Sequence, residues 1–320
     1  MRPDLLARLR CPRCEAERRL DVADAQADEH EVRHGLVRCA ACGAEFAIAD
    51  GIIELLPNPP EHIAREAAGL GRFAAVMRAD GWDCARIREL PYVDLPYWWG
   101  QRRAFDYWIE QLPFAAGEWL LDLGANTCWA SAEFARRGLS VIAVDITTIE
   151  LQGLRSAECF IADGSLYFER VQSSMADLAI ASESVDYVFC CETLHHNGRA
   201  ALRQTLRECH RVLRPGGSLL VVNEPLRFPL RPKRDHASEV AEFEGNEHVY
   251  FLHEYLLAAL RAGFRASVRY PRNSPRRSRE EPAPVPPSSR KPRIVRQAYS
   301  TWKLAAAGDA SLNMLCRKPG

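Results

Sequence analysis

WLLDLGANTCWASAEFARRGLSVIAVDI, residues 119–146, is the stretch that decides the fold of this 320-residue chain. It opens with a short apolar run at residues 119–121, passes through a polar turn, and continues with a segment of helical composition at residues 128–137. A β-branched run at residues 141–144 then ends on Asp145. This order predicts a strand–loop–helix–strand unit, whose right-handed crossover makes the two strands parallel and places the loop at their carboxyl edge.

The loop after the first expected strand has the features of a nucleoside-binding turn. The helix that follows it would leave backbone N–H groups free for a polar or anionic ligand. Asp145 lies roughly 20 residues after Gly124, at the tip of the second strand, where a carboxylate can accept hydrogen bonds from both hydroxyl groups of a ribose. The stretch therefore predicts a ligand that contains a nucleoside.

Four short motifs, in the same order along the chain, resemble the class I S-adenosylmethionine-dependent methyltransferases, in particular those of type 11. Residues 121–124 (LDLG), together with Asp145, resemble the first two motifs of that family. Its SFDVV strand, LHH element and RVLKPGG turn are resembled by residues 184–189 (SVDYVF), 194–196 (LHH) and 211–217 (RVLRPGG). Each motif alone is weak, but four in order make the resemblance specific.

The resemblance implies an α/β fold with a doubly wound, Rossmann-like sheet of seven strands in the order 3-2-1-4-5-7-6, strand 7 being antiparallel. It also implies an enzyme that binds S-adenosylmethionine and transfers its methyl group. The family usually has Gly-x-Gly-x-Gly in the loop, and this chain has Gly124, Asn126 and Cys128. Asparagine tolerates a positive φ, so the turn is expected to survive at Asn126, whereas Cys128 adds a side chain where the cofactor would approach the backbone.

Cofactor contacts are implied along the carboxyl edge of this sheet. Asp122 and Gly124 would shape the methionine end, and Asp145 would hold the ribose. The family often has an acid that pairs with the adenine amino group; here Ser174 stands in its place and Asp177 follows, so either is a candidate, and Asp177 could equally be a turn residue. The expected cofactor-binding residues are Asp122, Gly124, Asn126, Asp145, Ile146, Ser174, Met175, Asp177 and Cys191.

The catalytic candidates lie at the ends of the fourth and fifth expected strands and beyond them. Methyl transfer needs an aligned nucleophile and a group that takes its proton, a task that suits histidine because its ordinary pKa is near 6.5. A loop-ordering role for the two adjacent histidines and a surface role for His248 are the alternatives. Cys191 is either a nucleophile or a strand-packing residue. The expected catalytic residues are His195, His196, Glu224 and His248.

Two C-x-x-C pairs near the N-terminus predict a structural zinc site. Each pair places two thiolates on one side of a tight turn, and two such turns build the tetrahedral sulfur cage that Zn²⁺ prefers. Gly43 follows the second pair and can supply a left-handed turn. Because all four ligands are sulfur, no coordination position is left for catalysis. The expected metal ligands are Cys11, Cys14, Cys39 and Cys42.

The segment that follows the second cysteine pair, DGIIELLP at residues 50–57, resembles the end of the small zinc ribbon of the tRNA-methyltransferase-activator type. The resemblance implies a zinc ribbon at residues 1–57 and a methyltransferase domain at residues 113–320. Between them, residues 58–112 are expected to form a linker and a helical and aromatic lid segment. A domain as small as the ribbon buries little core, so zinc would supply much of its folding energy.

Two segments bear on the substrate. Residues 91–100 hold four aromatic side chains between prolines and are expected to be non-helical, forming either a wall of a substrate pocket together with residues 244–253 or a packing segment. Residues 271–310 form a Pro-, Arg- and Ser-rich insertion that is expected to lack a core and could contact phosphates. A small-molecule acceptor is favoured; the alternatives are ribosomal or transfer RNA, and a non-catalytic scaffold with an eroded cofactor loop.

Composition narrows the classes further. Lysine plus arginine equals aspartate plus glutamate at 42 each, so the net charge points to no particular partner. No run of about 18 apolar residues exists, which predicts no membrane span. Eleven cysteines without a recognisable export signal predict a reducing, cytoplasmic location, where thiols bind metal or pack as small apolar residues. The sequence makes no prediction of the oligomeric state.

Overall fold

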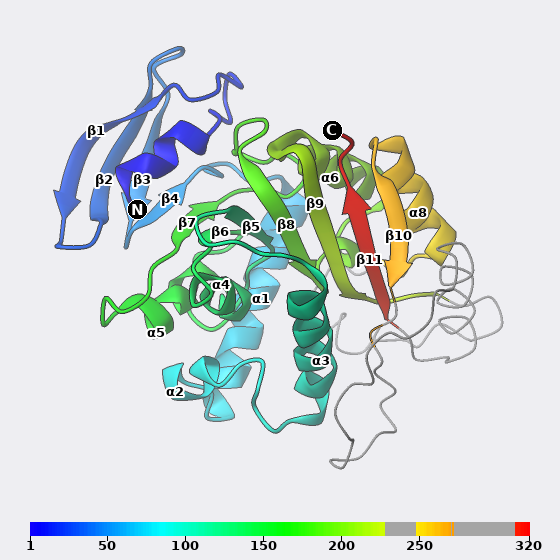
Figure 1. The fold of residues 1–320 in the computed structure, drawn as a ribbon. Helices are drawn as coiled ribbons and strands as arrows, with labels where there is room; N and C mark the ends of the chain where they lie inside the picture. The colour runs from blue at the N-terminus through cyan, green and yellow to red at the C-terminus, as the bar shows by residue number, and fades with distance from the viewer. Residues whose placement is uncertain (228–247, 270, 272–310) are drawn as a thin grey trace.

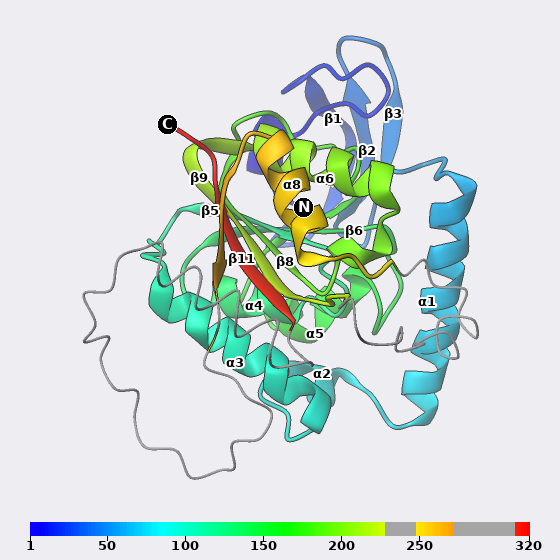
Figure 2. The same cartoon turned by 90° about the vertical axis from the view of Figure 1, so that its right-hand side faces the viewer.

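The computed structural model of the chain describes residues 1–227, 248–269, 271 and 311–320. The basic insertion expected at residues 271–310 lies outside the described residues except for its first member, and so does part of the lid expected at residues 244–253. Within the described part, the chain forms one mixed sheet with helices on both faces (Figures 1 and 2).

Among the described residues, eleven strands make up this sheet, in the order β1-β2-β3-β4-β7-β6-β5-β8-β9-β11-β10. The seven strands from β7 to β10 follow the expected order 3-2-1-4-5-7-6, and β11 runs antiparallel to both β9 and β10. The strands are β1 (Leu20–Ala27), β2 (Val32–Cys39), β3 (Glu45–Ala49), β4 (Ile52–Glu54), β5 (Trp119–Leu123), β6 (Ser140–Asp145), β7 (Glu169–Gln172), β8 (Val185–Cys191), β9 (Leu213–Glu224), β10 (Arg265–Arg269) and β11 (Leu312–Arg317).

Helices cover both faces of the seven strands because successive strand residues point to opposite sides. In β5, Leu120 packs toward α3, α4 and α5, whereas Leu121 and Leu123 pack toward α6 and α8. The helices are α1 (Glu61–Ala79), α2 (Cys84–Arg88), α3 (Pro96–Gln111), α4 (Trp129–Ala135), α5 (Glu158–Ile161), α6 (Arg199–Val212) and α8 (Leu252–Arg261), with 3-10 helices η1 (Pro3–Arg8), η2 (Leu154–Ala157) and η3 (Leu194–His196).

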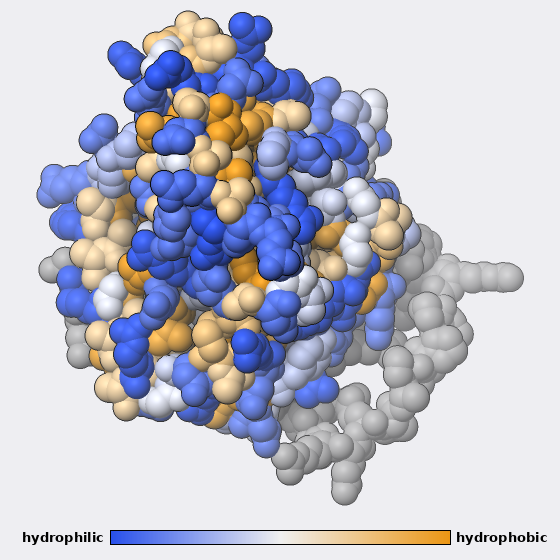
Figure 3. Space-filling view, turned by 90° about the vertical axis from the view of Figure 1, so that its left-hand side faces the viewer, coloured by the Kyte–Doolittle hydropathy of each residue, from blue (hydrophilic) through white to orange (hydrophobic). Residues whose placement is uncertain are grey.

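The N-terminal ribbon does not stand apart from the methyltransferase-like sheet but extends it. Strand β4 pairs in parallel with β7, Ile52 opposite Arg170 and Ile53 opposite Val171. This pairing satisfies the backbone groups of an edge strand and raises the strand count from the expected seven to eleven. Beneath the pairing, the fully buried Arg170 guanidinium forms ion pairs with Glu31 of the ribbon and with Glu158. Figure 3 shows the face that carries the ribbon, where hydrophilic residues surround smaller hydrophobic patches.

Two expectations were wrong. The aromatic segment at residues 91–100 is partly helical, because α3 begins at Pro96, and proline is well tolerated in the first turn of a helix. Not all cysteines outside the two pairs are thiols, because Cys84 of α2 and Cys159 of α5 form a disulfide. None of the helices in the described ranges combines the length and the hydropathy needed to cross a membrane.

Candidate functional site

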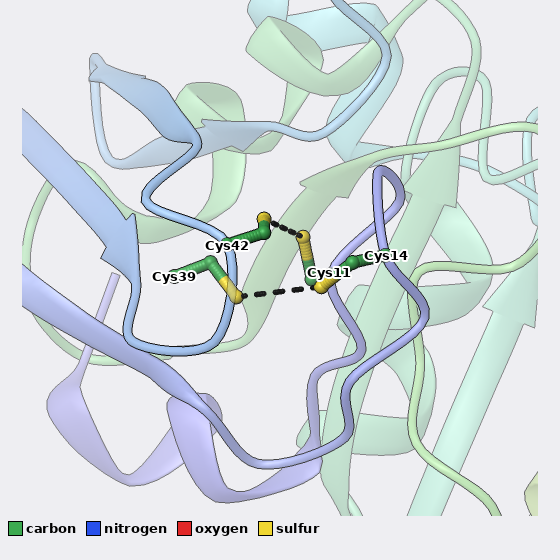
Figure 4. Close-up of side chains that lie close together, drawn as sticks. All are labelled: Cys11, Cys14, Cys39 and Cys42. Atoms are coloured by element: carbon green, nitrogen blue, oxygen red, sulfur yellow. Dashed lines mark hydrogen bonds between the residues drawn. The ribbon is translucent and has the colours of Figure 1, made fainter.

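The four cysteines of the ribbon converge as the spacing predicted (Figure 4). Their Sγ atoms all lie within 4.8 Å of one another, with Cys11 3.8 Å from Cys42 and Cys14 3.7 Å from Cys39. A tetrahedral zinc site with Zn–S bonds of about 2.3 Å has S···S edges of about 3.8 Å, so the cluster has the dimensions of such a site.

Both cysteine pairs form the same turn. In each, the backbone N–H four residues after the first cysteine donates to that cysteine's carbonyl: Glu15 to Cys11 at 2.9 Å, and Gly43 to Cys39 at 2.8 Å. Gly43 has φ +71°, as expected for a left-handed turn, and Glu15 holds the equivalent position with φ +60°. The left-handed turn at Glu15 was not predicted, because glutamate seldom adopts a positive φ.

A cavity of about 770 Å³ lies at the carboxyl ends of β5, β6 and β8. Its floor is the loop at residues 122–127 together with Asp145 and Ile146. Its walls come from α1, which runs along one side of the molecule in Figure 2, and from the first turns of α3. Residues from eight helices and strands of the described chain therefore enclose the edge that the strand–loop–helix–strand unit predicted.

Asp145 holds the loop between β5 and α4 from the tip of β6. One carboxylate oxygen accepts from the N–H of Asn126 at 2.9 Å and the other accepts from the N–H of Thr147 at 3.1 Å. Burial raises the pKa of Asp145 to about 6, although these backbone bonds oppose the shift. Each oxygen keeps a lone pair for a further donor, such as a ribose hydroxyl.

The altered glycine loop keeps its shape. Gly124 has φ +72°, and a Cβ there would lie 2.4 Å from the Thr193 side chain, so only glycine fits. Asn126 takes the left-handed conformation that was expected of it, with φ +45°. Cys128 is also left-handed, but its side chain is fully buried in the apolar core and does not line the cavity. The expected crowding of a cofactor by Cys128 is therefore absent from the described geometry.

Asp122 lines the same floor and is 3% exposed. Ser131 donates its hydroxyl hydrogen to one of the carboxylate oxygens at 2.6 Å. Burial raises the pKa of Asp122 to about 7, since the bonds from Ser131 offset only part of the lost hydration. A cationic ligand group beside this carboxylate would stabilise its charged form.

The two adenine candidates do not reach the cavity. Asp177 is an exposed side chain that forms an ion pair with Arg10 of the ribbon. The Ser174 hydroxyl accepts from the N–H of Ala176 at 3.3 Å, forming a local turn. Met175 and Ser173 line the cavity instead. Of the two candidates, Asp177 faces the ribbon, a contact between distant segments that sequence motifs do not encode.

His195 and Glu224 form a buried pair beside the cavity. The carboxylate of Glu224 accepts from the backbone N–H groups of Thr193, Leu194 and His195 and lies 3.0 Å from His195 Nδ1. Burial pushes the pKa of Glu224 upward, but His195 and the backbone donors outweigh it and hold the pKa below its usual value. His195 lines the cavity and Glu224 does not, so Glu224 orients the histidine rather than contacting a ligand.

Of the other two catalytic candidates, one lines the cavity and the other does not. His196 lines the cavity, and its Nδ1 lies 3.0 Å from a carboxylate oxygen of Glu66 on α1. His248 does not line it; its backbone N–H donates to the carbonyl of His195 at 2.7 Å, and its ring stacks near Tyr250. His248 therefore supports the loop that carries His195. Cys191 lines the cavity at the end of β8, and burial raises the pKa of its thiol, which disfavours a thiolate.

Several lining residues were not among the sequence candidates. They come from one face of α1 and from the first two turns of α3. They are Glu66, Leu70, Phe73, Met77, Trp98 and Gln101. The helical composition of residues 61–88 and the aromatic residues before the first strand were visible signals. Neither signal indicated which helix face would meet the sheet edge, since that depends on tertiary packing.

Comparison with known proteins agrees with the motifs. Residues 121–221 match the family described as "Methyltransferase domain". Over 113 residues the chain is 30% identical to the ubiquinone biosynthesis O-methyltransferase of Pseudomonas syringae pv. tomato, a match that covers 35% of this chain and 47% of that protein. Over 98 residues it is 35% identical to the biotin biosynthesis bifunctional protein BioHC of Cellvibrio japonicus, covering 31% and 18%.

Among solved structures, the fold is similar to the phosphoethanolamine N-methyltransferase 2 of Haemonchus contortus in complex with S-adenosyl-L-methionine. The TM-score is 0.49 at 16% identity, covering 78% of this chain and 60% of that one. The match to the family described as "Methyltransferase domain" spans residues 121–221, about a third of the chain. The chain matches less than half of the length of these curated relatives, 47% and 18%.

Proposed function

We propose that this chain is an S-adenosylmethionine-dependent methyltransferase that acts on a small molecule. One observation carries the proposal: a cavity of about 770 Å³, at the carboxyl edge of the methyltransferase domain, is walled by α1 and α3. Its volume lies in the range of small-molecule sites, which are concave and largely apolar with a few polar groups. Trp98, Trp129, Phe73 and Leu70 supply the apolar surface.

The floor of the cavity suits the cofactor. Asp145 has lone pairs free for the ribose hydroxyls, Asp122 and the Gly124 turn would meet the methionine end, and Met175 would flank the adenine. Ile146 and Asn126 complete the ribose side. When bound, the cofactor supplies a methyl group on a positively charged sulfonium. The buried carboxylates of Asp122 and Asp145 favour a ligand with that charge.

His195 is the proposed proton acceptor. A hydrogen on Nδ1 would be donated to Glu224, which leaves Nε2 as the acceptor nitrogen on a ring fixed by that bond. Glu224 is a positioning residue, because it is fully buried behind the histidine. His196, paired with Glu66, is the second candidate, and its pairing ties the η3 turn to α1.

The ribbon is proposed to hold one structural zinc ion through Cys11, Cys14, Cys39 and Cys42. The S···S distances of 3.7 and 3.8 Å support this role, and a four-sulfur site leaves no open position for substrate. Because β4 of the ribbon pairs with β7, the zinc would also stabilise one edge of the catalytic sheet.

Two other functions remain as alternatives. An RNA methyltransferase would use the ribbon and the basic insertion, but residues 1–57 contain eight arginines against eleven acids, which disfavours phosphate contacts there. A scaffold without cofactor affinity would require an eroded loop. The left-handed Asn126 and the inward-facing Cys128 instead preserve that loop.

The proposal is tested by following an isotopically labelled methyl group. The purified chain is incubated with labelled S-adenosylmethionine and either the small-molecule fraction or the RNA fraction of a cell extract. Label that enters small molecules, and is lost on His195→Ala, is the expected result. Label found only in RNA would favour the RNA alternative. No transfer, together with no binding of S-adenosylhomocysteine, would favour the scaffold.

A further inference from the structure

We propose that the acceptor end of the cavity is an amine-binding subsite formed by Glu192 and Gln101, and that the methyl acceptor is the primary amine of a small molecule. The inference rests on the proposed function and names its substrate class. Both residues line the cavity, Glu192 directly after β8 and Gln101 in the second turn of α3.

Glu192 is held in one position by two neighbours on α3. One carboxylate oxygen accepts from the Gln101 amide at 2.8 Å, and the other accepts from the hydroxyl of Tyr97. The backbone of Glu192 is left-handed, with φ +52°, a conformation that non-glycine residues rarely take and that often accompanies functional sites. Burial raises the pKa of Glu192, so its charged form would gain from a positively charged ligand.

Gln101 has one polar atom without a partner. The side chain is 4% exposed, and its carbonyl oxygen makes no hydrogen bond to any residue in the described part of the chain. Its orientation is fixed chemically, because a flipped amide would place that oxygen against the Glu192 carboxylate. A buried acceptor that stays unpaired costs about 1–3 kcal/mol, so a hydrogen donor of the ligand is expected there.

The charges around the cavity agree with an amine. None of the described residues that line the cavity is a lysine or an arginine. Five acidic residues line it: Glu66, Asp80, Asp122, Asp145 and Glu192. An acceptor molecule whose reacting end carried a carboxylate or phosphate would therefore meet like charge at Glu192. Trp98 lies beside Tyr97 and packs edge-on against Trp129, 6.0 Å between ring centroids, which gives the subsite an aromatic wall. Aromatic faces attract cations.

Counting donors distinguishes an amine from an alcohol. The Glu192 carboxylate and the Gln101 carbonyl offer two acceptors on hydrogen-bonded side chains that both line the cavity. A neutral primary amine has two N–H groups for them and still keeps a lone pair for the methyl carbon. A hydroxyl group has one hydrogen and would leave one acceptor unpaired. The pair of acceptors therefore favours a primary amine over an alcohol or phenol of the same shape.

The proposed methyl transfer conserves atoms, electrons and charge. The ammonium form of the substrate gives one proton to His195, which frees the nitrogen lone pair. A carbon–nitrogen bond then forms as the carbon–sulfur bond breaks, and sulfur keeps the electron pair of the broken bond. The positive charge moves from sulfur to nitrogen, beside Glu192, whose fixed carboxylate stabilises the charge where it develops. The products are the methylated ammonium, S-adenosylhomocysteine and the proton on His195.

The test compares two probes of equal shape, phenethylamine and 2-phenylethanol, by calorimetry on the full chain saturated with S-adenosylhomocysteine. The amine is expected to bind at least about tenfold more tightly than the alcohol, the size of one good hydrogen bond to a charged group. In Gln101→Met and in Glu192→Gln this preference is expected to fall below about threefold. Gln111→Met, at an exposed position of the same helix, is the control and should keep the preference.

Equal binding of the two probes, tighter binding of the alcohol, or no binding of the amine would overturn the amine subsite. Saturation with S-adenosylhomocysteine is measured first. This measurement distinguishes failure of the amine subsite from failure of the proposed methyltransferase function. A chain that binds S-adenosylhomocysteine but shows no amine preference refutes only the subsite. A chain that does not bind it refutes the methyltransferase proposal.

Discussion

The ribbon cluster and the cofactor cavity place reactive groups in space by opposite means. The four cysteines come from two short turns, each with its own backbone hydrogen bond, so their positions follow from local spacing. The described cavity residues come from eight helices and strands, and their positions depend on how the helices pack on the sheet. The residues of a site built from local turns can be predicted from sequence. For a site built from packed elements, only the residues at the strand ends can be predicted.

The two sites also differ in what they need in order to fold. The ribbon shares its buried core with one face of the sheet and is expected to depend on its metal, whereas the cavity floor is held by a buried hydrogen-bond framework around Asp145 and Asp122. The shared strand pair β4–β7 couples them.

Loss of the zinc ligands is expected to have the largest effect. Cys39→Ser should abolish binding of about one equivalent of zinc and unfold the ribbon, because structural zinc contributes about 10–16 kcal/mol of apparent binding free energy in small domains. Metal analysis and circular dichroism measure both effects. Cys209→Ser, a buried cysteine of α6 outside the cluster, is the control for metal content. Wild-type protein purified without chelators and found free of zinc would contradict the site.

The second largest effect is expected at the junction between the ribbon and the sheet. Arg170→Met leaves Glu31 buried without its main partner, and removal of one member of a buried ion pair costs about 3–5 kcal/mol of the free energy of unfolding. Arg214→Met, which removes a pair with Asp186 at the surface, should cost about 1 kcal/mol or less. Urea unfolding compares the two variants. Equal losses would show that the ribbon is not coupled to the sheet through Arg170.

At the cavity floor, Asp145→Ala should weaken binding of S-adenosylhomocysteine by more than about tenfold. It removes the proposed acceptor of two ribose hydroxyls, and hydrogen bonds to a charged group contribute about 1.5–3 kcal/mol each. The substitution also frees the N–H of Asn126. Asp163→Ala, in an exposed turn, is the matched control. An unchanged dissociation constant for Asp145→Ala would mean that the ribose lies elsewhere.

The buried floor carboxylates also predict that the free energy of unfolding depends on pH. Burial raises the pKa of Asp122 to about 7, above its usual value of 3.8, so between about pH 4 and 7 the folded state binds more protons than the unfolded state. The free energy of unfolding should therefore fall, by about 2 kcal/mol or more, as the pH rises through this window. Asp122→Asn should flatten that slope. A wild-type slope that is flat or rises in the window would contradict the buried charge.

Deletion of residues 272–310 is expected to have the smallest effect. These residues lie outside the described structure, and β10 and β11, on either side of them, are paired directly. Turnover of a small molecule should change little, whereas an RNA enzyme would lose RNA affinity and the salt dependence of binding. Electrophoretic mobility shift at two salt concentrations measures this. A salt-sensitive, submicromolar RNA complex that disappears on deletion would favour the RNA alternative.

Much of the fold followed from sequence because its motifs mark strand ends. The order of the seven methyltransferase strands, Asp145 at the tip of β6 and the left-handed turn at Asn126 all agree with the expectations. The eleven-stranded sheet did not follow, since the pairing of β4 with β7 joins segments more than 100 residues apart in the chain. Motifs describe single segments and say little about such contacts.

The site was predicted only in part, for the same reason. Asp122, Gly124 and His195 line the cavity as expected, whereas Ser174, Asp177, Glu224 and His248 do not. Asp177 pairs with Arg10 because the ribbon packs against the turn that carries it. Gln101 went unnoticed because a lone glutamine in a helix has no sequence signature; its unpaired carbonyl oxygen appears only once the helix is packed.

The central claim is that the cavity floor binds the methyl donor, and calorimetric titration of the wild-type chain with S-adenosylhomocysteine tests it most directly. We expect saturable binding of about one molecule per chain, weakened more than about tenfold by Asp145→Ala and unchanged by Asp163→Ala. No saturable binding at millimolar ligand, in protein that retains its zinc and its fold, would contradict the account.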